Sequence, residues 1–497
     1  MTSYVDCIVQ ADFGSGWDTD FINDVLPPVS VQAGIRGGKI TDRIASPGTA
    51  TFSLNNSGSN YTSTQGYWSP KNSNVRANWG KNVPIRIGLQ EQGGSVNWFF
   101  YGKVKRIDPN AGIYGGRRVD VTVMDFMDDL QADSGGKRIA IKEDYRSDEA
   151  YGDLITAADS SPEGTDFSTG VIIMPAVFHR ATGKNVRIYE ELNRIATSNF
   201  EYVYLTHAGY IKSQSMTDRL LDDTVQFTLN NTMKNIQVAE STRDIPRAFT
   251  FLTYPTTTGT TREVIASVGS PVRIDGGETV TFEVNYRDPS GGSDIAGKNI
   301  LAPVANTDYT FSTIERSQSG DYNSNLDLTV TEYATMAEVV ATNNGGSVAW
   351  LDKFELRGIA IRTNDEVSST EEISGTEGAE VRINLYYVAG VSIGKAAAVM
   401  ATNVYGEIYA QSVSFKPQRS SAMLTGFLGT DIGKRIALVE TVTGVDNEYF
   451  INGYEFEWRS RYDLDASYML APARSETPFI VGTSEVGGSD LVLFSGG

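Results

Sequence analysis

A serine with the surroundings of an enzyme nucleophile lies in the segment GVSIG, from Gly390 to Gly394. This G-x-S-x-G pattern holds the nucleophile of many hydrolases, in which the acid and the histidine base follow the serine in the chain. The only two histidines here, His179 and His207, both precede Ser392, and the strand before the segment is typical of an antiparallel system. We therefore interpret GVSIG as a structural strand-to-helix turn. A cell-wall hydrolase acting through Ser392 is the least favoured alternative.

His207 lies in the segment THAG, between two runs of alternating residues. A histidine can serve as a general base near neutral pH, but no acidic residue stands nearby in the sequence to orient it, which favours a turn position. The acidic pairs Asp128 with Asp129 and Glu371 with Glu372 have the chemistry of glycosidase carboxylates. Because the chain holds 61 acidic residues, no two of them stand out, and a solvated surface is the expected role.

Two further segments resemble ligand-binding loops without completing the pattern. GSDIAGKN, beginning at Gly292, departs from the phosphate-binding loop at Asn299, where a hydroxyl would hold magnesium, and Pro303 follows where a helix is needed. In DYNSNLDLTVTE, Leu326 stands where a calcium loop needs glycine. The side chains at the other calcium-loop places are Asp321, Asn323, Asn325, Asp327 and Glu332. We expect a loop entering a strand, leave calcium binding open, and predict no catalytic residue, metal site or cofactor.

The charge balance is acidic, with 42 lysine and arginine residues against 61 aspartate and glutamate residues and a net charge of −19. Such a surface disfavours DNA and anionic lipid, so no sequence-specific nucleic acid is expected as a partner. Cys7 is the only cysteine, which allows no intrachain disulfide and, with two histidines, no usual zinc site. The chain begins without a signal-peptide pattern, and its longest apolar run, VIIMPAVF, is too short to form an integral membrane segment. We expect a soluble protein made in a cytoplasm.

Hydrophobic alternation predicts a mainly β, multidomain protein with α+β parts and antiparallel β-barrels or sandwiches. In TATFSLNN, for example, Ala50, Phe52 and Leu54 alternate with polar residues, as in a half-buried strand. The predicted parts are an N-terminal β-barrel at 1–135, an α+β segment with a helix and a β-hairpin at 136–245, an inserted β-sandwich-like domain at 246–350, a C-terminal β-rich domain at 351–475 and a flexible or partner-ordered tail at 476–497.

Helical periods are clearest in the second part. Two apolar stripes follow the period of a helix there: Ala150, Leu154, Ile155 and Ala158 in the first, and Ile188, Leu192, Ile195 and Ala196 in the second. After the second stripe the period becomes two, and a hairpin is expected to reverse near His207 and Gly209. DFMDDLQADSGG predicts a short helix that ends at Gly135 and Gly136, and IGKAAAVMATNVYGEIYA predicts one later helix at 393–410.

Three stretches resemble the minor tail, or tail-tip hub, proteins of long-tailed bacteriophages and phage-like particles, which are related to baseplate hubs. The first is GTATFSLNNSGSNYTS with KNVPIRIGLQ, WFFYGKVKRIDPN and RRVDVTVMDFMDDLQ, which is similar to the N-terminal barrel of that family. The second, IYEELNRIATSNFEYVYLTHAGYIKSQS, resembles its helix and aromatic hairpin. The third, DIGKRIALVETVTGVDNEYFINGYEFEWRSRYDLDASYMLAPA, resembles its closing β-segment.

The resemblance implies a virion structural protein at the tail tip, assembled in the host cytoplasm, rather than an enzyme. It implies a homotrimeric ring that joins a distal tail or tail tube protein to fibre or spike proteins and takes part in host attachment. We add the hypothesis that the acidic charge lines a DNA conduit, because an acidic lumen repels phosphates. The main alternative is a carbohydrate-binding adhesin of the tail tip that recognises a host surface glycan through the Thr-, Gly- and aromatic-rich region 246–350.

Overall fold

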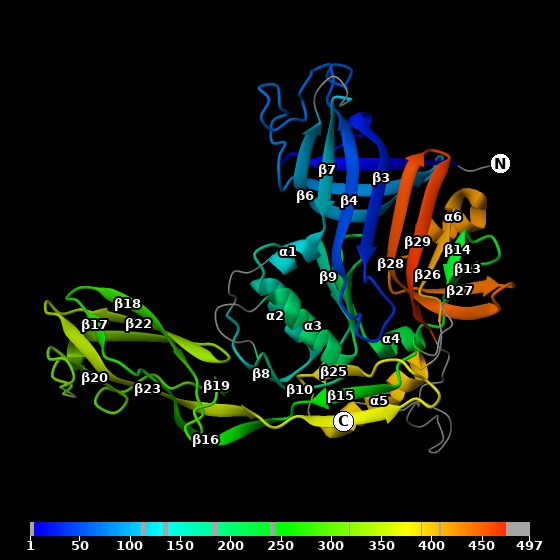
Figure 1. The fold of residues 1–497 in the computed structure, drawn as a ribbon. Helices are drawn as coiled ribbons and strands as arrows, with labels where there is room; N and C mark the ends of the chain where they lie inside the picture. Colours follow the sequence, from blue (N-terminus) through cyan, green and yellow to red (C-terminus); the bar gives the residue numbers. More distant parts are fainter. Residues whose placement is uncertain are drawn as a thin grey trace.

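The protein consists of a body of β-sheets and short helices from which a long arm of strands extends to one side (Figure 1). Its structure is a computed structural model. The residues that it describes are 4–110, 116–132, 138–180, 187–238, 243, 245–317, 319–388, 390–406 and 409–473. Gly135, Gly136 and the predicted tail at 476–497 lie outside the described residues.

The largest sheet unites the two ends of the chain. Its strands run in the order β14-β26-β29-β28-β3-β4-β7-β6-β5-β1-β2, and β27 pairs with β28 and β13 beside this path. The bounds are β1 Val5–Asp12, β2 Trp17–Asp18, β3 Val25–Gly34, β4 Ser46–Asn55, β5 Pro84–Glu91, β6 Val96–Asn110, β7 Arg118–Met124, β13 Val225–Leu229, β14 Asn235–Gln237, β26 Ser412–Phe415, β27 Arg435–Glu440, β28 Val445–Ser460 and β29 Asp463–Pro472. The first and last strands of the described chain therefore build one sheet.

Alternation along β4 confirms the strand predicted in TATFSLNN. Ala50, Phe52 and Leu54 are at most 3% exposed, whereas Thr51 faces solvent. Strand β3 was not predicted, because Pro27 and Pro28 interrupt its pattern and proline is uncommon inside a sheet. Strand β3 pairs with β4 at Leu26 and again at Ser30. The residues between them, including both prolines, form a β-bulge.

No ladder among the described strands closes the large sheet, so the sheet found where an N-terminal β-barrel was predicted is open. Both edges of β28 are already occupied, one by β29 and the other by β27 and, further along the strand, by β3, and β1 therefore finds no free edge there. Two hydrogen bonds nevertheless connect the start of β1 with the end of β28. The Val5 N–H donates to the Arg461 carbonyl at 2.9 Å, and the Trp458 indole N–H donates to the Val5 carbonyl at 2.8 Å.

The helix-rich middle of the body lies under the large sheet (Figure 1). Its helices are α1 Phe126–Ala132, α2 Ser147–Ala157, α3 Ile188–Asn199 and α4 Met216–Leu221, and its strands are β8 Lys142–Tyr145, β9 Gly164–Phe167, β10 Met174–Val177, β11 Tyr202–Leu205 and β12 Tyr210–Gln214. The predicted stripe of α3 is confirmed, since Ile188, Leu192, Ile195 and Ala196 are all fully buried. Strands β11 and β12 form the predicted hairpin, and Gly209 takes the positive φ of its turn.

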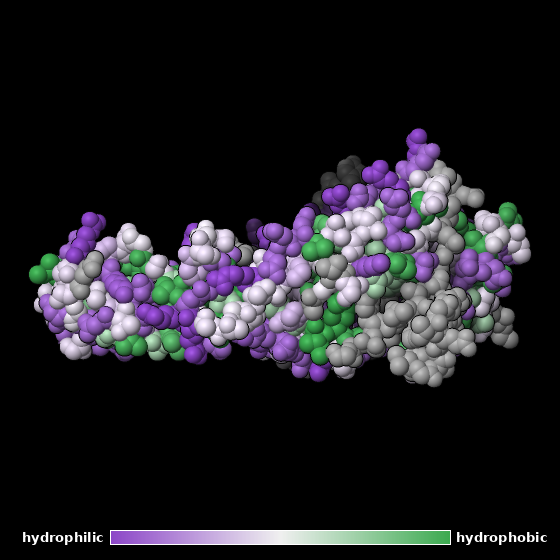
Figure 2. Space-filling view, turned by 90° about the horizontal axis from the view of Figure 1, so that it is seen from below, coloured by the Kyte–Doolittle hydropathy of each residue, from purple (hydrophilic) through white to green (hydrophobic). Residues whose placement is uncertain are grey.

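The arm is a sandwich of two small sheets. One sheet holds β16 Thr256–Ser267, β17 Val272–Ile274, β19 Ala296–Lys298, β20 Tyr309–Ser312 and β23 Ala349–Thr363, and the other holds β18 Thr279–Asn285, β21 Leu326–Glu332 and β22 Met336–Asn343. Their facing side chains, among them Ile265, Phe311 and Leu351, form a core separate from that of the body. Apolar residues on the face seen in Figure 2 are scattered among polar ones along the arm.

A third sheet, with a helix packed on it, lies where the arm strands return to the body. It pairs β15 Ala248–Thr253 with β24 Val367–Glu372 and β25 Val381–Leu385, and α5 Val391–Tyr405 covers it. α5 confirms the predicted late helix. A further helix, α6 Ser421–Gly429, follows, and the Ser420 hydroxyl accepts from the Met423 N–H at its start. The mainly β, multidomain fold is thus confirmed, and no helix in the described parts of the chain is long and apolar enough to cross a membrane.

Candidate functional sites

The GVSIG segment forms the start of α5, as the structural interpretation predicts. Gly390 is the residue before the first turn, and Ser392 is exposed. The expectation of an antiparallel strand before it is wrong, because β25 pairs in parallel with β15, although only at a sheet edge. In the described structure neither histidine bonds to Ser392: the His179 Nδ1 lies 3.1 Å from the Ala176 carbonyl, and His207 contacts Asp431. The parts of a serine hydrolase are therefore not brought together here.

The two segments that resemble ligand-binding loops, GSDIAGKN and DYNSNLDLTVTE, form structural parts of the arm. Lys298 belongs to strand β19, which pairs with β23, so GSDIAGKN leads into a strand rather than a helix. Asn323 accepts from the Phe311 N–H at 2.7 Å and donates to the Asn306 side chain at 2.8 Å, and Leu326 begins strand β21. The prediction of a loop entering a strand is confirmed. Within the described residues no group of three His, Cys, Asp or Glu side chains is placed to hold a metal ion.

Of the acidic pairs, Asp128 and Asp129 lie in the first turn of α1 and bind two lysines of β6. Lys105 contacts both carboxylates, at 3.0 and 2.5 Å, and Lys103 contacts Asp129 at 2.7 Å. Glu371 and Glu372 lie on β24, the outer strand of the third sheet, and Glu372 is exposed. The two pairs belong to different sheets and different parts of the body. Glu372 thus has the predicted solvated position, whereas Asp128 and Asp129 are partly buried in ion pairs rather than solvated.

His207 occupies the centre of a junction between distant parts of the chain. Its ring packs 4.4 Å from the ring of Phe99 on β6 and 4.8 Å from that of Tyr454 on β28, measured between centroids. Its backbone N–H donates to both carboxylate oxygens of Asp431, at 3.1 and 3.0 Å. Burial lowers the pKa of His207, and the nearby Asp431 carboxylate only partly offsets this. The ring is therefore mainly neutral at pH 7 and serves as a packed turn residue.

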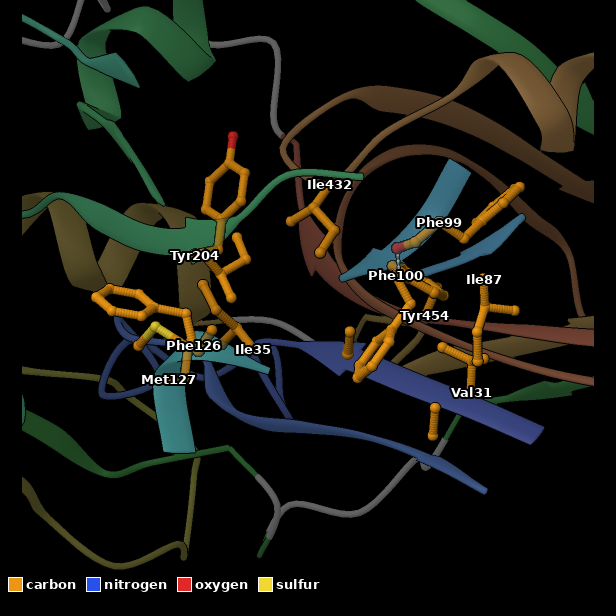
Figure 3. Packing of buried hydrophobic residues seen from close by; sticks show 14 of the residues in the cluster. Val31, Ile35, Ile87, Phe99, Phe100, Phe126, Met127, Tyr204, Ile432 and Tyr454 are labelled. Atoms are coloured by element: carbon orange, nitrogen blue, oxygen red, sulfur yellow. Dashed lines mark hydrogen bonds between the residues drawn. The ribbon is translucent and has the colours of Figure 1, made fainter. Parts of the chain in front are cut away.

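The same junction is closed by further contacts between these segments. The Tyr454 hydroxyl donates to the Phe99 carbonyl, as the dashed line in Figure 3 shows. Gly433 has a φ of 81°, and a Cβ at this position would lie 2.2 Å from the Tyr204 hydroxyl, so only glycine fits. Figure 3 shows Tyr204 and Ile432 on neighbouring elements of this core. We call the set Phe99, Tyr204, His207, Asp431, Gly433 and Tyr454 the His207 junction.

Two buried arginines enclose a tyrosine below this junction. Arg43 and Arg219 are each 1% exposed, and their guanidinium carbons lie 4.6 and 3.4 Å from the centre of the Tyr202 ring. Arg219 donates to the side chains of Gln214, at 2.9 Å, and Asn452, at 2.8 Å. Burial raises the pKa of Tyr202, but the two cations outweigh this and leave it below its usual value. The arrangement fixes the hairpin to the loop before β4 and to β28.

Three buried carboxyl groups have perturbed acidities and local partners. Burial raises the pKa of Glu201 and that of Asp125 to about 7 in each case, against opposing hydrogen bonds. Glu201 accepts from the hydroxyls of Ser147, at 2.6 Å, and Tyr151, at 2.7 Å. Burial also raises the pKa of Glu191, which accepts from the Tyr387 hydroxyl at 2.5 Å. These groups lie in different places and join elements of the body, so they support structure rather than a shared reaction.

The arm is held to the body by the segment 138–143. Glu143 on β8 forms an ion pair with Lys298 on β19 and accepts from the Thr258 hydroxyl at 3.1 Å. Arg138 binds Glu283 and Glu338 of the second arm sheet, and the Ala334 N–H donates to the Ile139 carbonyl at 2.9 Å. Ion pairs at the arm base therefore set how the arm is attached.

Reversing one charge of this attachment should loosen it. We expect Lys298→Glu to destabilise the arm base by about 1–2 kcal/mol, because two carboxylates would then face each other at a partly buried contact. Hydrogen exchange of β19 and β23 would measure the loss as faster exchange. The swapped pair Glu143→Lys with Lys298→Glu should recover most of it, whereas Arg273→Glu, at the exposed Arg273–Asp275 pair, should leave exchange at the arm base unchanged. Unchanged exchange in Lys298→Glu would contradict the assignment.

Several strand edges are left unpaired by the described ladders. In the arm, β18 and β21 each pair only with β22, so each presents one edge of seven residues. In the body, β24 pairs only with β15. The large sheet, by contrast, ends in β2 and β14, which have only two and three residues. Long open edges present rows of backbone donors and acceptors that a neighbouring strand can pair with.

Comparison with known proteins gives matches among solved structures alone. No protein-family model and no curated protein matches the sequence. Similar structures include the tail protein from Neisseria meningitidis MC58 (9% identity, TM-score 0.47, 93% of this chain and 96% of that one) and the 43 kDa tail protein of prophage MuSo2 from Shewanella oneidensis (9%, 0.47, 95% and 97%). A third is prophage tail protein gp18 from Listeria monocytogenes EGD-e (9%, 0.40, 93% and 94%). These are tail proteins, the class that the sequence resembles.

Proposed function

We propose that this protein is a structural component of the tail tip of a long-tailed bacteriophage or phage-like particle. In this role three copies form a hub ring that joins the tail tube to distal fibres or a spike. One observation carries the proposal: the three stretches that resemble hub proteins meet at the His207 junction. Phe99 comes from the first stretch, Tyr204 and His207 from the second, and Asp431 and Tyr454 from the third. Unrelated chance similarities would have no reason to converge in space.

Two features of the molecule suit assembly into a ring. The open edges of β18, β21 and β24 offer backbone groups for pairing with neighbouring subunits or with other tail proteins. The net charge of −19 suits a passage for DNA, because an acidic wall repels phosphates and lets the genome slide. The buried carboxyls Glu191 and Glu201 and the imidazole of His207 have partners inside the body, in keeping with a scaffold.

Electron cryomicroscopy of intact particles from the source culture, with this chain traced at the tail end, tests the proposal. We expect three copies around the tube axis, each contacting the tube above and fibre or spike proteins below. Light scattering of the purified chain, alone and with its tail partners, gives the number of copies independently. A chain that stays monomeric with those partners and occurs in no particle would overturn the hub role, and a basic or neutral channel would remove the acidic conduit.

A further inference from the structure

A cleft of about 350 Å³ lies where the arm meets the body. The body contributes His179, Arg180, Arg194 and Tyr386, and the arm contributes the segment 294–296 with Thr335 and Thr363. The volume is within the range of sites for small ligands. Because its two walls come from separate hydrophobic cores, a ligand bound there would touch the body and the arm together.

Arg180 is the main cation of this cleft. Its guanidinium carbon lies 4.4 Å from the centre of the Tyr254 ring and 4.9 Å from that of the Tyr386 ring, so two tyrosines fix its plane. Its Nε is buried without a hydrogen-bond partner, and no ion pair to it occurs in the described residues. A guanidinium held in place, without a carboxylate, is prepared to bind an oxyanion through two parallel hydrogen bonds.

His179 lies beside Arg180 in the wall of the cleft. Its side chain is 5% exposed, and its Nδ1 lies 3.1 Å from the Ala176 carbonyl, which can only accept, so Nδ1 carries the hydrogen. Burial lowers the pKa of His179 to about 4, and the ring is therefore neutral at pH 7. Its Nε2 is consequently an acceptor, and it is enclosed with no partner among the described residues. A ligand in the cleft would therefore change the surroundings of the ring without bonding to this atom.

The other charged groups at the cleft leave Arg180 as the available cation. Arg194 is engaged by the buried carboxylate of Glu191 and by the Arg180 carbonyl. Asp294, at the arm side, is exposed and lies at the rim. Its carboxylate accepts hydroxyl hydrogens and repels a second negative charge. The cleft therefore favours a ligand with one oxyanion and neighbouring hydroxyls over a polyanion.

We propose that this cleft binds the oxyanion, carboxylate or phosphate, of a small hydroxylated ligand such as an acidic sugar unit, with Arg180 holding the anion beside the buried ring of His179. This binding site is additional to the proposed hub role and does not depend on it. A cell-surface polysaccharide is one source of such a group and a phosphate-bearing polymer is another. Both sources carry an oxyanion, a carboxylate in one and a phosphate in the other, so a separate probe for each distinguishes them.

The chain's two histidines provide a direct measurement. The full chain is labelled with 13Cε1-histidine, and the ring signals are assigned with His179→Gln and His207→Gln. Galacturonate, inorganic phosphate and galactose are then added in separate titrations at constant ionic strength and pH. We expect saturable shifts of the His179 signal with galacturonate or phosphate and little change with galactose, while His207 stays constant as the internal reference. A response to galacturonate alone assigns a carboxylate ligand, and one to phosphate alone assigns a phosphate ligand.

Variants of Arg180 separate binding from folding. Arg180→Gln should weaken the oxyanion at least about tenfold, the effect of losing a charge-assisted hydrogen bond, whereas Arg180→Lys should retain part of the affinity. Arg187→Gln is the matched control, since Arg187 lies outside the cleft and is exposed. An unchanged His207 signal reports that each variant is folded. The proposal is overturned by no saturable shift at His179, by equal shifts with galactose, or by full binding in Arg180→Gln.

Discussion

Replacing Trp68 with alanine should lower the free energy of unfolding of the body by about 4 kcal/mol. Trp68 is fully buried at the centre of an aromatic cluster, in the loop between β4 and β5. The centre of its ring lies 5.0 Å from that of Tyr67, 5.2 Å from that of Phe21 and 5.3 Å from that of Trp79. Alanine would leave a cavity that these rings, packed in the core, could not fill completely.

The same substitution removes a polar contact. The Trp68 indole N–H donates to the Asp24 carboxylate at 2.8 Å, and the Tyr61 N–H donates to the other oxygen at 2.9 Å. Burial raises the pKa of Asp24, and these bonds oppose the shift. Trp68→Phe keeps most of the ring but loses the N–H, so it should cost about 1–2 kcal/mol and separate the two contributions.

Urea unfolding followed by far-ultraviolet circular dichroism measures both effects. Trp98→Ala is the matched control, because Trp98 is half-buried on the outer side of β6 and its main interaction is with Arg86, at 4.0 Å. That change should cost about 1 kcal/mol. Equal losses in Trp68→Ala and Trp98→Ala would show that the aromatic cluster does not stabilise the sheet as argued.

Glu201→Gln should remove a pH-dependent loss of stability. Burial raises the pKa of Glu201 to about 7, whereas an unfolded glutamate releases its proton near pH 4.5. Between these values the folded state binds more protons than the unfolded state, so the free energy of unfolding falls as the pH rises. The stabilising effect of the proton is complete below about pH 4.5 and is lost on passing pH 7. A shift of this size corresponds to on the order of 3 kcal/mol.

Glutamine resembles the protonated side chain and keeps partners for the Ser147 and Tyr151 hydroxyls. We therefore expect the variant to be close to the parent at pH 5 and clearly more stable than it at pH 8. Urea midpoints of both proteins at a series of pH values give the difference, in which groups common to both, such as Asp125, cancel. Glu372→Gln, on the exposed edge of β24, is the matched control substitution. A constant difference between Glu201→Gln and the parent would refute the buried titration.

Local patterns in the sequence predicted local structure well. The apolar stripe of α3, the alternation of β4 and the hairpin turn near His207 depend on neighbouring residues, and all three are confirmed. A signal for α6 was also present, because Ser420 is a good N-cap and Met423, Leu424 and Phe427 follow at helical spacing. The strand β3 was hidden by Pro27 and Pro28, since two prolines in a row interrupt every strand pattern.

Partners distant in the chain could not be read from those patterns. Asp431 meets His207 across 224 positions, and nothing near His207 indicates it. Glu191 lies in the first turn of α3, where the helix dipole favours any acidic residue, yet it is 1% exposed and bonds to Tyr387 across 196 positions. The cleft residue Arg180 gave no sequence signal either, because its significance comes from the stacked rings of Tyr254 and Tyr386. These features depend on how the sheets pack, which only the complete fold determines.

The place of β28 in the large sheet has a consequence for the timing of synthesis. The bond from Trp458 to Val5 joins residues 453 positions apart, and β3 finds its second neighbour only in β28. A ribosome that adds 5–20 residues per second needs roughly 20–90 s to reach that point. Through this interval the nascent amino-terminal strands have an exposed edge and a half-covered core. Newly made chains are therefore vulnerable to aggregation until β28 has been synthesised, and a chain truncated ahead of β28 would leave β3 without its second neighbour.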